Sequence, residues 1–114
     1  MTETLADEDQ KLVVLARGAL ARAEARSGAA VRDGDGRTYA GAEVRTKTLT
    51  LSGLQVAVAS AISSGATAFE AAVLVNGDDE DPGLATLHEL SPQAYAYVTD
   101  AAGRPQQRLG GADV

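Results

Sequence analysis

Cysteine is absent from the 114-residue sequence, and histidine and aromatic residues are scarce. The lack of cysteine excludes disulfides, zinc sites made of thiolates and thiol nucleophiles. The single histidine, His88, has no cysteine, second histidine or nucleophile-elbow serine to complete a catalytic constellation, so we interpret it as a helix-surface residue. One phenylalanine and three tyrosines offer little for the stacking of nucleic-acid bases.

An excess of basic residues is also missing, because the formal net charge is −6. This charge argues against a nucleic-acid partner, which needs clustered lysine and arginine. Neither a signal peptide nor a membrane-spanning run is visible, so we expect a cytoplasmic protein with no membrane partner. No Walker loop and no G-x-G-x-x-G motif is present. The length predicts one domain over residues 1–114, large enough to fold without disulfides or a metal.

Residues 51–65, which lie within the longest uncharged run, are the segment around which we expect the fold to be built. Ser52 followed by Gln55 has the form of a capping box, which predicts a helix start, and Gly65 supplies a left-handed stop. The helix between them is apolar on nearly all sides, and such a helix is typically buried. It is too short for a bilayer, which needs about 20 apolar residues. We therefore expect a central helix of the domain or of an oligomer core.

Periodicity and turn signals predict the other elements. In chain order these are a helix at 7–25, hairpin strands at 29–32 and 37–40, a strand at 43–49, a strand at 69–75, a helix at 83–90, a strand at 94–99 and an edge strand at 104–109. We expect Gly28 to end the first helix and the 69–75 strand to lie in the middle of the sheet. The D-G-D-G turn at 33–36 has the start of a calcium loop, but its twelfth position is Val44 rather than glutamate, so a turn is the better interpretation. The acidic run 78–81 is interpreted as a solvated loop rather than a cation site.

Several segments of this sequence are similar to the small, homotetrameric type of cytidine deaminase. These are residues 27–31 with the D-G turn after them, residues 39–44, and the capped helix that closes with residues 61–65. In that family a V-G-A-A strand, a D-G hairpin, a G-x-N-x-E strand and a C-A-E-R helix follow one another at nearly these spacings. The match runs without gaps from about Gly28 to Val75, and a looser match covers residues 81–103. The resemblance implies an α/β protein with three α/β/α layers and a mixed sheet of about five strands.

The catalytic residues of that family are not carried over. The resemblance places the first zinc ligand at Leu54, the proton-shuttling glutamate at Val56, and the two further ligands near Glu80 and Gly83. None of these residues is a cysteine or a histidine. We therefore expect Leu54 and Val56 to be buried as part of the core, and we expect no metal and no other cofactor.

The ribose-binding residues of the family correspond to Glu43 and Arg45, which leaves at most a vestigial ligand site there. These substitutions predict a catalytically silent protein that acts by self-association and by binding a protein or a small ligand. The alternative is a cytidine or related nucleoside deaminase with non-standard chemistry, as the family would imply. The small residues of the 52–64 helix, and the tetramers that the family forms through this region, predict a homo-oligomer, a tetramer in preference to a dimer. An unidentified protein partner stays open as well.

Overall fold

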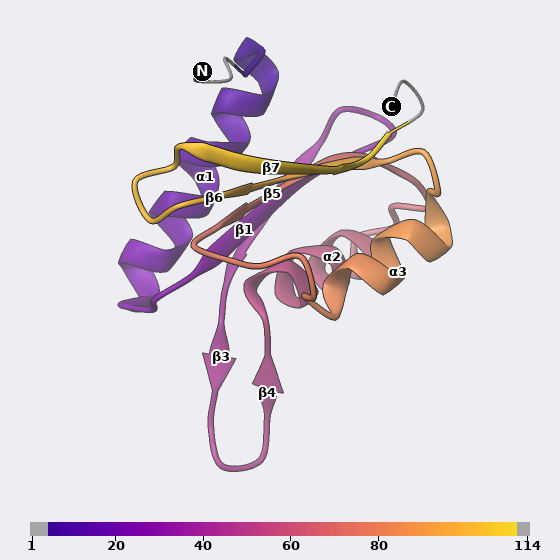
Figure 1. Ribbon diagram of the computed structural model, residues 1–114. Helices are drawn as coiled ribbons and strands as arrows, with labels where there is room; N and C mark the ends of the chain where they lie inside the picture. Colours follow the sequence, from indigo (N-terminus) through magenta and orange to yellow (C-terminus); the bar gives the residue numbers. More distant parts are fainter. Residues whose placement is uncertain (1–4, 112–114) are drawn as a thin grey trace.

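The fold is built on one mixed, five-stranded sheet. The computed structural model describes residues 5–111. The strand order is β2-β1-β5-β6-β7, with β5 and β6 parallel and the other neighbours antiparallel (Figure 1). The bounds are Gly28–Asp33 for β1, Thr38–Ala42 for β2, Phe69–Val75 for β5, Tyr95–Thr99 for β6 and Pro105–Gly110 for β7. The predicted hairpin, central strand and edge strand are confirmed.

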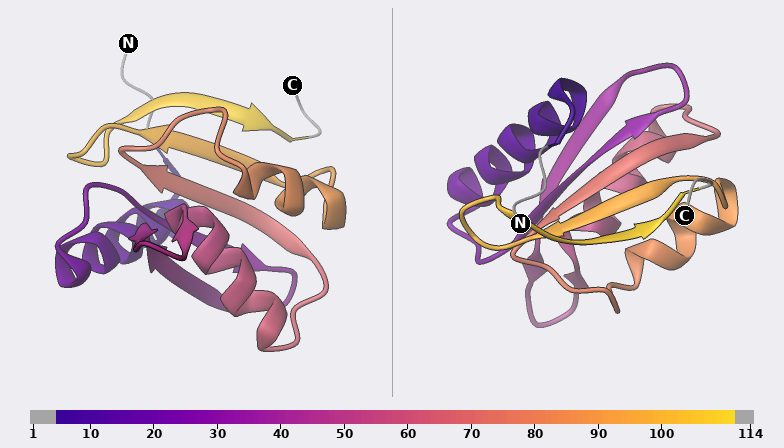
Figure 2. Two further views of the ribbon diagram at one scale, coloured as in Figure 1. Left: turned by 90° about the horizontal axis from the view of Figure 1, so that it is seen from below. Right: turned by 45° about the horizontal axis from the view of Figure 1, so that its top comes forward.

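Helices cover both faces of the sheet, which confirms the expected three-layer arrangement (Figures 1 and 2). The first helix, α1 (Asp7–Ala23), packs on one face, where Leu12 belongs to the same hydrophobic core as Val73 of β5. The other face carries α2 (Gly53–Ser63) and α3 (Gly83–Leu90). None of the helices within residues 5–111 is long and apolar enough to cross a membrane.

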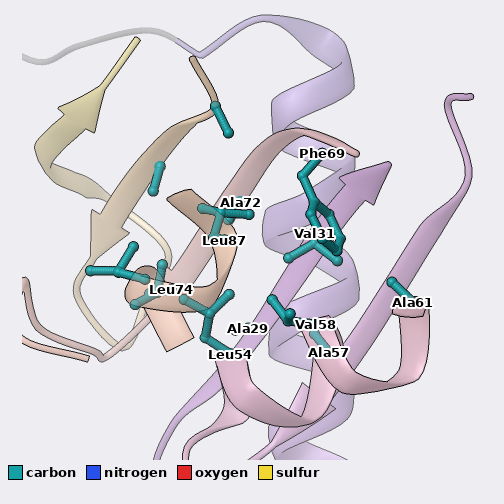
Figure 3. Close-up of a cluster of buried hydrophobic side chains, with 13 residues drawn as sticks. Ala29, Val31, Leu54, Ala57, Val58, Ala61, Phe69, Ala72, Leu74 and Leu87 are labelled. Carbon is teal, nitrogen blue, oxygen red and sulfur yellow. The ribbon is translucent and has the colours of Figure 1, made fainter. Parts of the chain in front are cut away.

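The core between α2, α3 and the sheet is the larger of the two. Figure 3 shows its side chains converging from both helices and from the strands. Leu54 and Leu87 are fully buried in it, each with 0% of its surface exposed. The other members include Ala57, Val58 and Ala61 from α2, and Val31, Phe69, Ala72 and Leu74 from the strands. The predicted central helix is therefore confirmed on its sheet-facing side.

Glycines let the backbones of α1, β1 and α2 approach one another closely. A Cβ built on Gly53 would stand 3.0 Å from the Cα of Gly28 and 3.0 Å from the carbonyl oxygen of Gly41. A Cβ on Gly28 would stand 2.6 Å from the carbonyl oxygen of Ala16 in α1. A side chain at Gly28 would therefore require movement of the α1 backbone, and one at Gly53 would force its neighbours to shift by a few tenths of an ångström. The start of α2 thus lies directly on the sheet.

The capping box at the start of α2 is confirmed. The Gln55 backbone N–H donates to the Ser52 hydroxyl oxygen at 3.0 Å, and the Ser52 N–H donates to the Gln55 side-chain oxygen at 3.0 Å. Gly65 follows the helix with a φ of 104°, as the predicted left-handed stop requires. The local sequence therefore determines both ends of this helix.

Two predicted boundaries are wrong. The first helix ends at Ala23 rather than at Gly28, because Glu24 already adopts a left-handed φ of 54°. Residues 43–49 do not form one strand. Instead β3 (Val44–Arg45) and β4 (Thr50–Leu51) pair in a separate two-stranded ribbon, which Figure 1 shows projecting from the sheet. The Thr46 N–H donates to the Leu49 carbonyl at 2.8 Å and closes the ribbon's turn.

Within one chain α2 is buried only on the side that faces the sheet, and the burial of its remaining apolar surface in an oligomer core stays a prediction. Ile62 is 41% exposed, and Ala59 and Ser60 are exposed beside it. Val56, expected in the core, is only half-buried and packs against Gly41 of β2, whose ideal Cβ position lies 2.7 Å from the Val56 Cβ. The sheet covers one side of the helix, and the opposite side meets solvent.

Candidate functional site

An open cleft of about 590 Å³ lies where the β3–β4 ribbon, the start of α2 and the loop between β5 and α3 meet. This volume is in the range of small-molecule sites. Its walls are mostly polar, and they include Glu43, Arg45, Ser52, Gln55, Asn76 and Asp81. Because carboxylate, guanidinium, hydroxyl and amide side chains all line this cleft, we treat it as the candidate site.

Asp81 ties the two helices behind the cleft together. Its carboxylate accepts a hydrogen bond from the Ser52 hydroxyl at 2.7 Å and another from the Gly83 N–H at 2.7 Å. The Ser52 hydroxyl thus accepts from the Gln55 N–H in the first turn of α2 and donates to Asp81, two residues before α3 begins. Because one carboxylate oxygen serves both helix starts, the relative position of α2 and α3 is held by a short, charge-assisted contact.

Leu54 and Gly83 lie against each other below this contact. A Cβ on Gly83 would stand 2.7 Å from the Leu54 Cγ and 2.9 Å from its Cβ, so the leucine side chain fills the space in front of α3. The resemblance implies zinc at these two positions, and zinc binds through sulfur, nitrogen or oxygen donors. Leu54 and Gly83 offer no such side-chain atom, and the nearby Asp81 oxygen already accepts two hydrogen bonds. The residues present here do not fit a zinc ion.

The other two positions that the resemblance implies for zinc chemistry are Val56 and Glu80. The Val56 side chain packs against β2 and does not line the cleft. Glu80 lines the cleft but is exposed, and its backbone N–H donates to the Asp78 carboxylate at 2.8 Å. Within residues 5–111, no three histidine, cysteine, aspartate or glutamate side chains are grouped closely enough to hold a metal ion.

Glu43 and Arg45 form an ion pair at the mouth of the cleft. The Arg45 guanidinium donates to the Glu43 carboxylate at 2.9 Å, and the Arg26 backbone N–H donates to the other carboxylate oxygen at 3.1 Å. The hydrogen bond from Arg45 is the main reason that the pKa of Glu43 lies below its usual value, and the Arg26 N–H lowers it further against the opposing effect of burial. The implied ligand positions are therefore occupied by a self-paired carboxylate and guanidinium.

His88 takes no part in the cleft. It lies on α3 with its Nε2 atom 3.0 Å from the carbonyl oxygen of Ala94, and it is not among the residues that line the cleft. The side chain is half-buried rather than on the surface, which corrects the expectation from sequence. Asp33, at the predicted D-G-D-G turn, accepts from the Asp35 and Arg37 N–H groups at 2.9 Å each. This confirms a turn as the role of that motif.

Sequence reasoning missed three residues that the structure places in the cleft, namely Gln55, Asn76 and Asp81. The capping box alone accounts for Gln55, so the sequence gives no reason to place it in a cleft. Asp81 is one of four consecutive acidic residues, and nothing in the sequence distinguishes it from the other three. Asn76 precedes a glycine at the end of a strand, and an Asn-Gly pair is a turn signal that points to a left-handed residue. The convergence of these three depends on how α2 and the 76–82 loop meet, which is a tertiary property.

Comparison with known proteins places this geometry in a family. A sequence model described as cytidine deaminase-like matches residues 5–103. The chain is similar in structure to cytidine deaminase from Burkholderia pseudomallei, with a TM-score of 0.75, 19% identity and 93% of each chain covered. It is also similar to a mutant cytidine deaminase from Mycobacterium tuberculosis (TM-score 0.64, 23% identity, 86% of this chain and 88% of the other). The enzyme from Mycobacterium leprae gives a TM-score of 0.64 at 22% identity, over 90% of this chain and 93% of the other. No curated protein sequence is significantly similar to the chain.

Proposed function

This chain belongs to the cytidine deaminase-like family, and we propose that it is a catalytically silent member that acts by self-association and by binding a protein or a small ligand. The observation that carries the proposal is the contact between Leu54 and Gly83, where an apolar side chain fills the space at the two implied zinc-ligand positions. A leucine buried at such a place stabilises the domain by about 1.5–3 kcal/mol. Leu54 therefore contributes to the packing of the hydrophobic core and supplies no ligand atom.

The loss of zinc chemistry would be large in energetic terms. Bound zinc lowers the pKa of a water molecule from about 15.7 to about 7, and an absent general acid or base alone costs roughly 10² to 10⁴ in rate. Val56 supplies no proton-transfer group, and its side chain points at β2 rather than into the cleft. Two of the four carboxylates that line the cleft, Asp81 and Glu43, accept hydrogen bonds of 2.7–3.1 Å.

A deamination assay tests the proposal. Purified protein is incubated with cytidine, with and without added zinc, and uridine formation is followed alongside a buffer blank. We expect no turnover above the blank in either condition. Turnover that a chelator removes would overturn the proposal, and turnover that a chelator leaves intact but Glu80→Gln removes would establish the alternative of a deaminase with non-standard chemistry.

Self-association is assigned to the solvent-facing side of α2. Leu51, Ala59, Ile62 and Thr86 line a shallow, mainly apolar depression of about 240 Å³ there. Ile62 is a large aliphatic side chain with 41% of its surface exposed. Contact with a second copy of the chain would remove this apolar surface from water, which is favourable. We propose a homo-oligomer, a tetramer in preference to a dimer, with α2 near its centre.

Light scattering on a sizing column decides the oligomeric state. The parent protein is expected to elute with a tetramer or dimer mass, and Ile62→Glu to shift towards the monomer because a charge would be buried in the interface. Val14→Glu is the matched control, because Val14 is 68% exposed on α1, on the opposite face of the sheet. A monomer mass for the parent at micromolar concentration would contradict self-association.

Small-ligand binding is assigned to the cleft. A ligand that binds only the folded state raises the melting temperature with concentration. Cytidine and uridine are the first probes, and Glu43→Gln is the control because it weakens the ion pair at the cleft mouth. A rise that Glu43→Gln abolishes supports ligand binding, and the absence of any rise with both nucleosides would leave a protein partner as the proposed binding mode.

A further inference from the structure

Asn76 is the only asparagine in the sequence, and Gly77 follows it directly. The pair lies at the end of β5, and both residues line the cleft. Asn76 is exposed and has a left-handed φ of 58°, one of two non-glycine residues with positive φ in the part of the chain that the structure describes. Non-glycine residues in this conformation are uncommon and concentrate at functional sites.

Two hydrogen bonds hold Asn76 in this conformation. Its backbone N–H donates to the Thr99 carbonyl at 2.9 Å, and its side-chain Nδ2 donates to the Arg26 carbonyl at 2.8 Å. By contrast, the Gly77 N–H makes no hydrogen bond to any of residues 5–111. The nitrogen next to the asparagine side chain is therefore free of a protein acceptor, and only the Nδ2 contact has to open before the side chain can turn.

We infer that Asn76 is a site of spontaneous deamidation through a cyclic imide. The Gly77 nitrogen attacks Cγ of Asn76, a new C–N bond forms, the Cγ–Nδ2 bond breaks, and Nδ2 leaves as ammonia with the proton from the Gly77 N–H. Solvent water then adds to one of the two ring carbonyls. Opening at one carbonyl gives aspartate, and opening at the other gives isoaspartate, in which the main chain runs through the side-chain carbon.

Glycine at position 77 is what makes the reaction accessible. Formation of the cyclic imide, a succinimide, requires rotation of the backbone between Asn76 and Gly77. Glycine is the residue with the greatest freedom to permit this rotation. The Asp33–Gly34 pair in the first hairpin is a useful contrast. Asp33 is only 2% exposed and its carboxylate accepts three hydrogen bonds, so its side chain is held away from the following nitrogen.

Deamidation would change the cleft. Either product replaces a hydrogen-bond donor to the Arg26 carbonyl with a carboxylate, which cannot donate, so the bond that joins the 76–77 corner to the segment before β1 is lost. Either product also adds a negative charge to a cleft that already contains Asp78, Glu80 and Asp81. We therefore expect the modified protein to melt at a lower temperature than the parent.

Mass spectrometry of aged protein tests the inference, and it does not depend on what the cleft binds. The folded protein is incubated at physiological pH and temperature and then digested. The mass of the peptide that contains Asn76 is measured over time, because deamidation replaces the side-chain NH₂ by OH and increases that mass. Asn76→Gly is the control, because glycine keeps the left-handed conformation and has no amide to lose. Isoaspartate must be localised by fragmentation, since Asp35–Gly36 forms it without a change in mass.

We expect the parent to convert with time into two products of equal mass, aspartate and isoaspartate, and Asn76→Gly to gain no mass. The same chain unfolded in urea gives the reference rate, and Gly77→Ala in urea should convert markedly more slowly than the parent in urea. The inference is overturned if the folded parent keeps its amide over the period in which the unfolded chain converts, or if Gly77→Ala in urea converts as fast as the parent.

Discussion

Replacing Leu54 by alanine should destabilise the domain severely. The side chain is 0% exposed and lies between α2, α3 and the sheet. The truncation removes three carbon atoms, worth about 2.4 kcal/mol at about 0.8 kcal/mol per buried methylene. A cavity penalty adds to this, and the total for such substitutions is about 2–5 kcal/mol. Gly83 has no side chain to fill the space, and its N–H is held by Asp81, so we expect the upper half of that range.

Thermal unfolding followed by circular dichroism measures the effect. A loss of about 3–5 kcal/mol in a domain of this size corresponds to a melting temperature at least about 10 °C lower. Leu49→Ala is the matched control, because Leu49 is 50% exposed in the turn of the β3–β4 ribbon and should change stability by less than about 0.5 kcal/mol. If Leu54→Ala melts within about 3 °C of the parent, Leu54 does not fill the space in front of Gly83 and our interpretation of the site is wrong.

Other substitutions test the packing and the charges away from the cleft. Gly53→Ala should cost about 1–3 kcal/mol, seen as a lower urea midpoint, because the added Cβ would stand 3.0 Å from the Cα of Gly28; an unchanged midpoint would contradict the close approach. Arg32→Ala should cost about 3–5 kcal/mol in the same assay, because it removes the ion-pair partner, at 3.1 Å, of the buried Asp9 carboxylate. Burial raises the pKa of Asp33, but hydrogen bonds from two backbone N–H groups and a tyrosine hydroxyl outweigh it and leave the pKa below its ordinary value. Its stabilising contribution is therefore complete above about pH 4 and is lost as the pH falls further, so Asp33→Asn should show a flatter decline of melting temperature in acid than the parent.

The elements that sequence predicted well are those determined by neighbouring residues. The capping box of Ser52 and Gln55, the left-handed Gly65 and the buried strand 69–75 each depend on a signal within a few positions. The β3–β4 ribbon was missed because each strand has only two residues, too few for an alternating pattern to be visible. The end of α1 was misplaced because Glu24, rather than a glycine, adopts the left-handed conformation.

The chemistry of the interior was not predictable in the same way. Arg32 on β1 binds Asp9 of α1 and Tyr95 of β6, at 3.1 Å and 3.0 Å, and also Glu70 of β5. These partners are 23 to 63 positions away in the chain, so no local pattern links them. The burial of Tyr95 and its hydrogen bond to Asp9 raise the pKa of its hydroxyl to about 12. The cleft depends on tertiary contacts in the same way, because Asp81 acquires its role only when α2 and α3 meet.

The zinc content of the purified protein shows whether the position of Leu54 has lost its metal. The protein is prepared without chelator and dialysed against metal-free buffer. Its zinc content per chain is then measured by inductively coupled plasma mass spectrometry. Because leucine and glycine stand at two of the implied ligand positions and the sequence contains no cysteine, we expect far less than one zinc per chain. One zinc per chain that persists through dialysis would contradict this expectation.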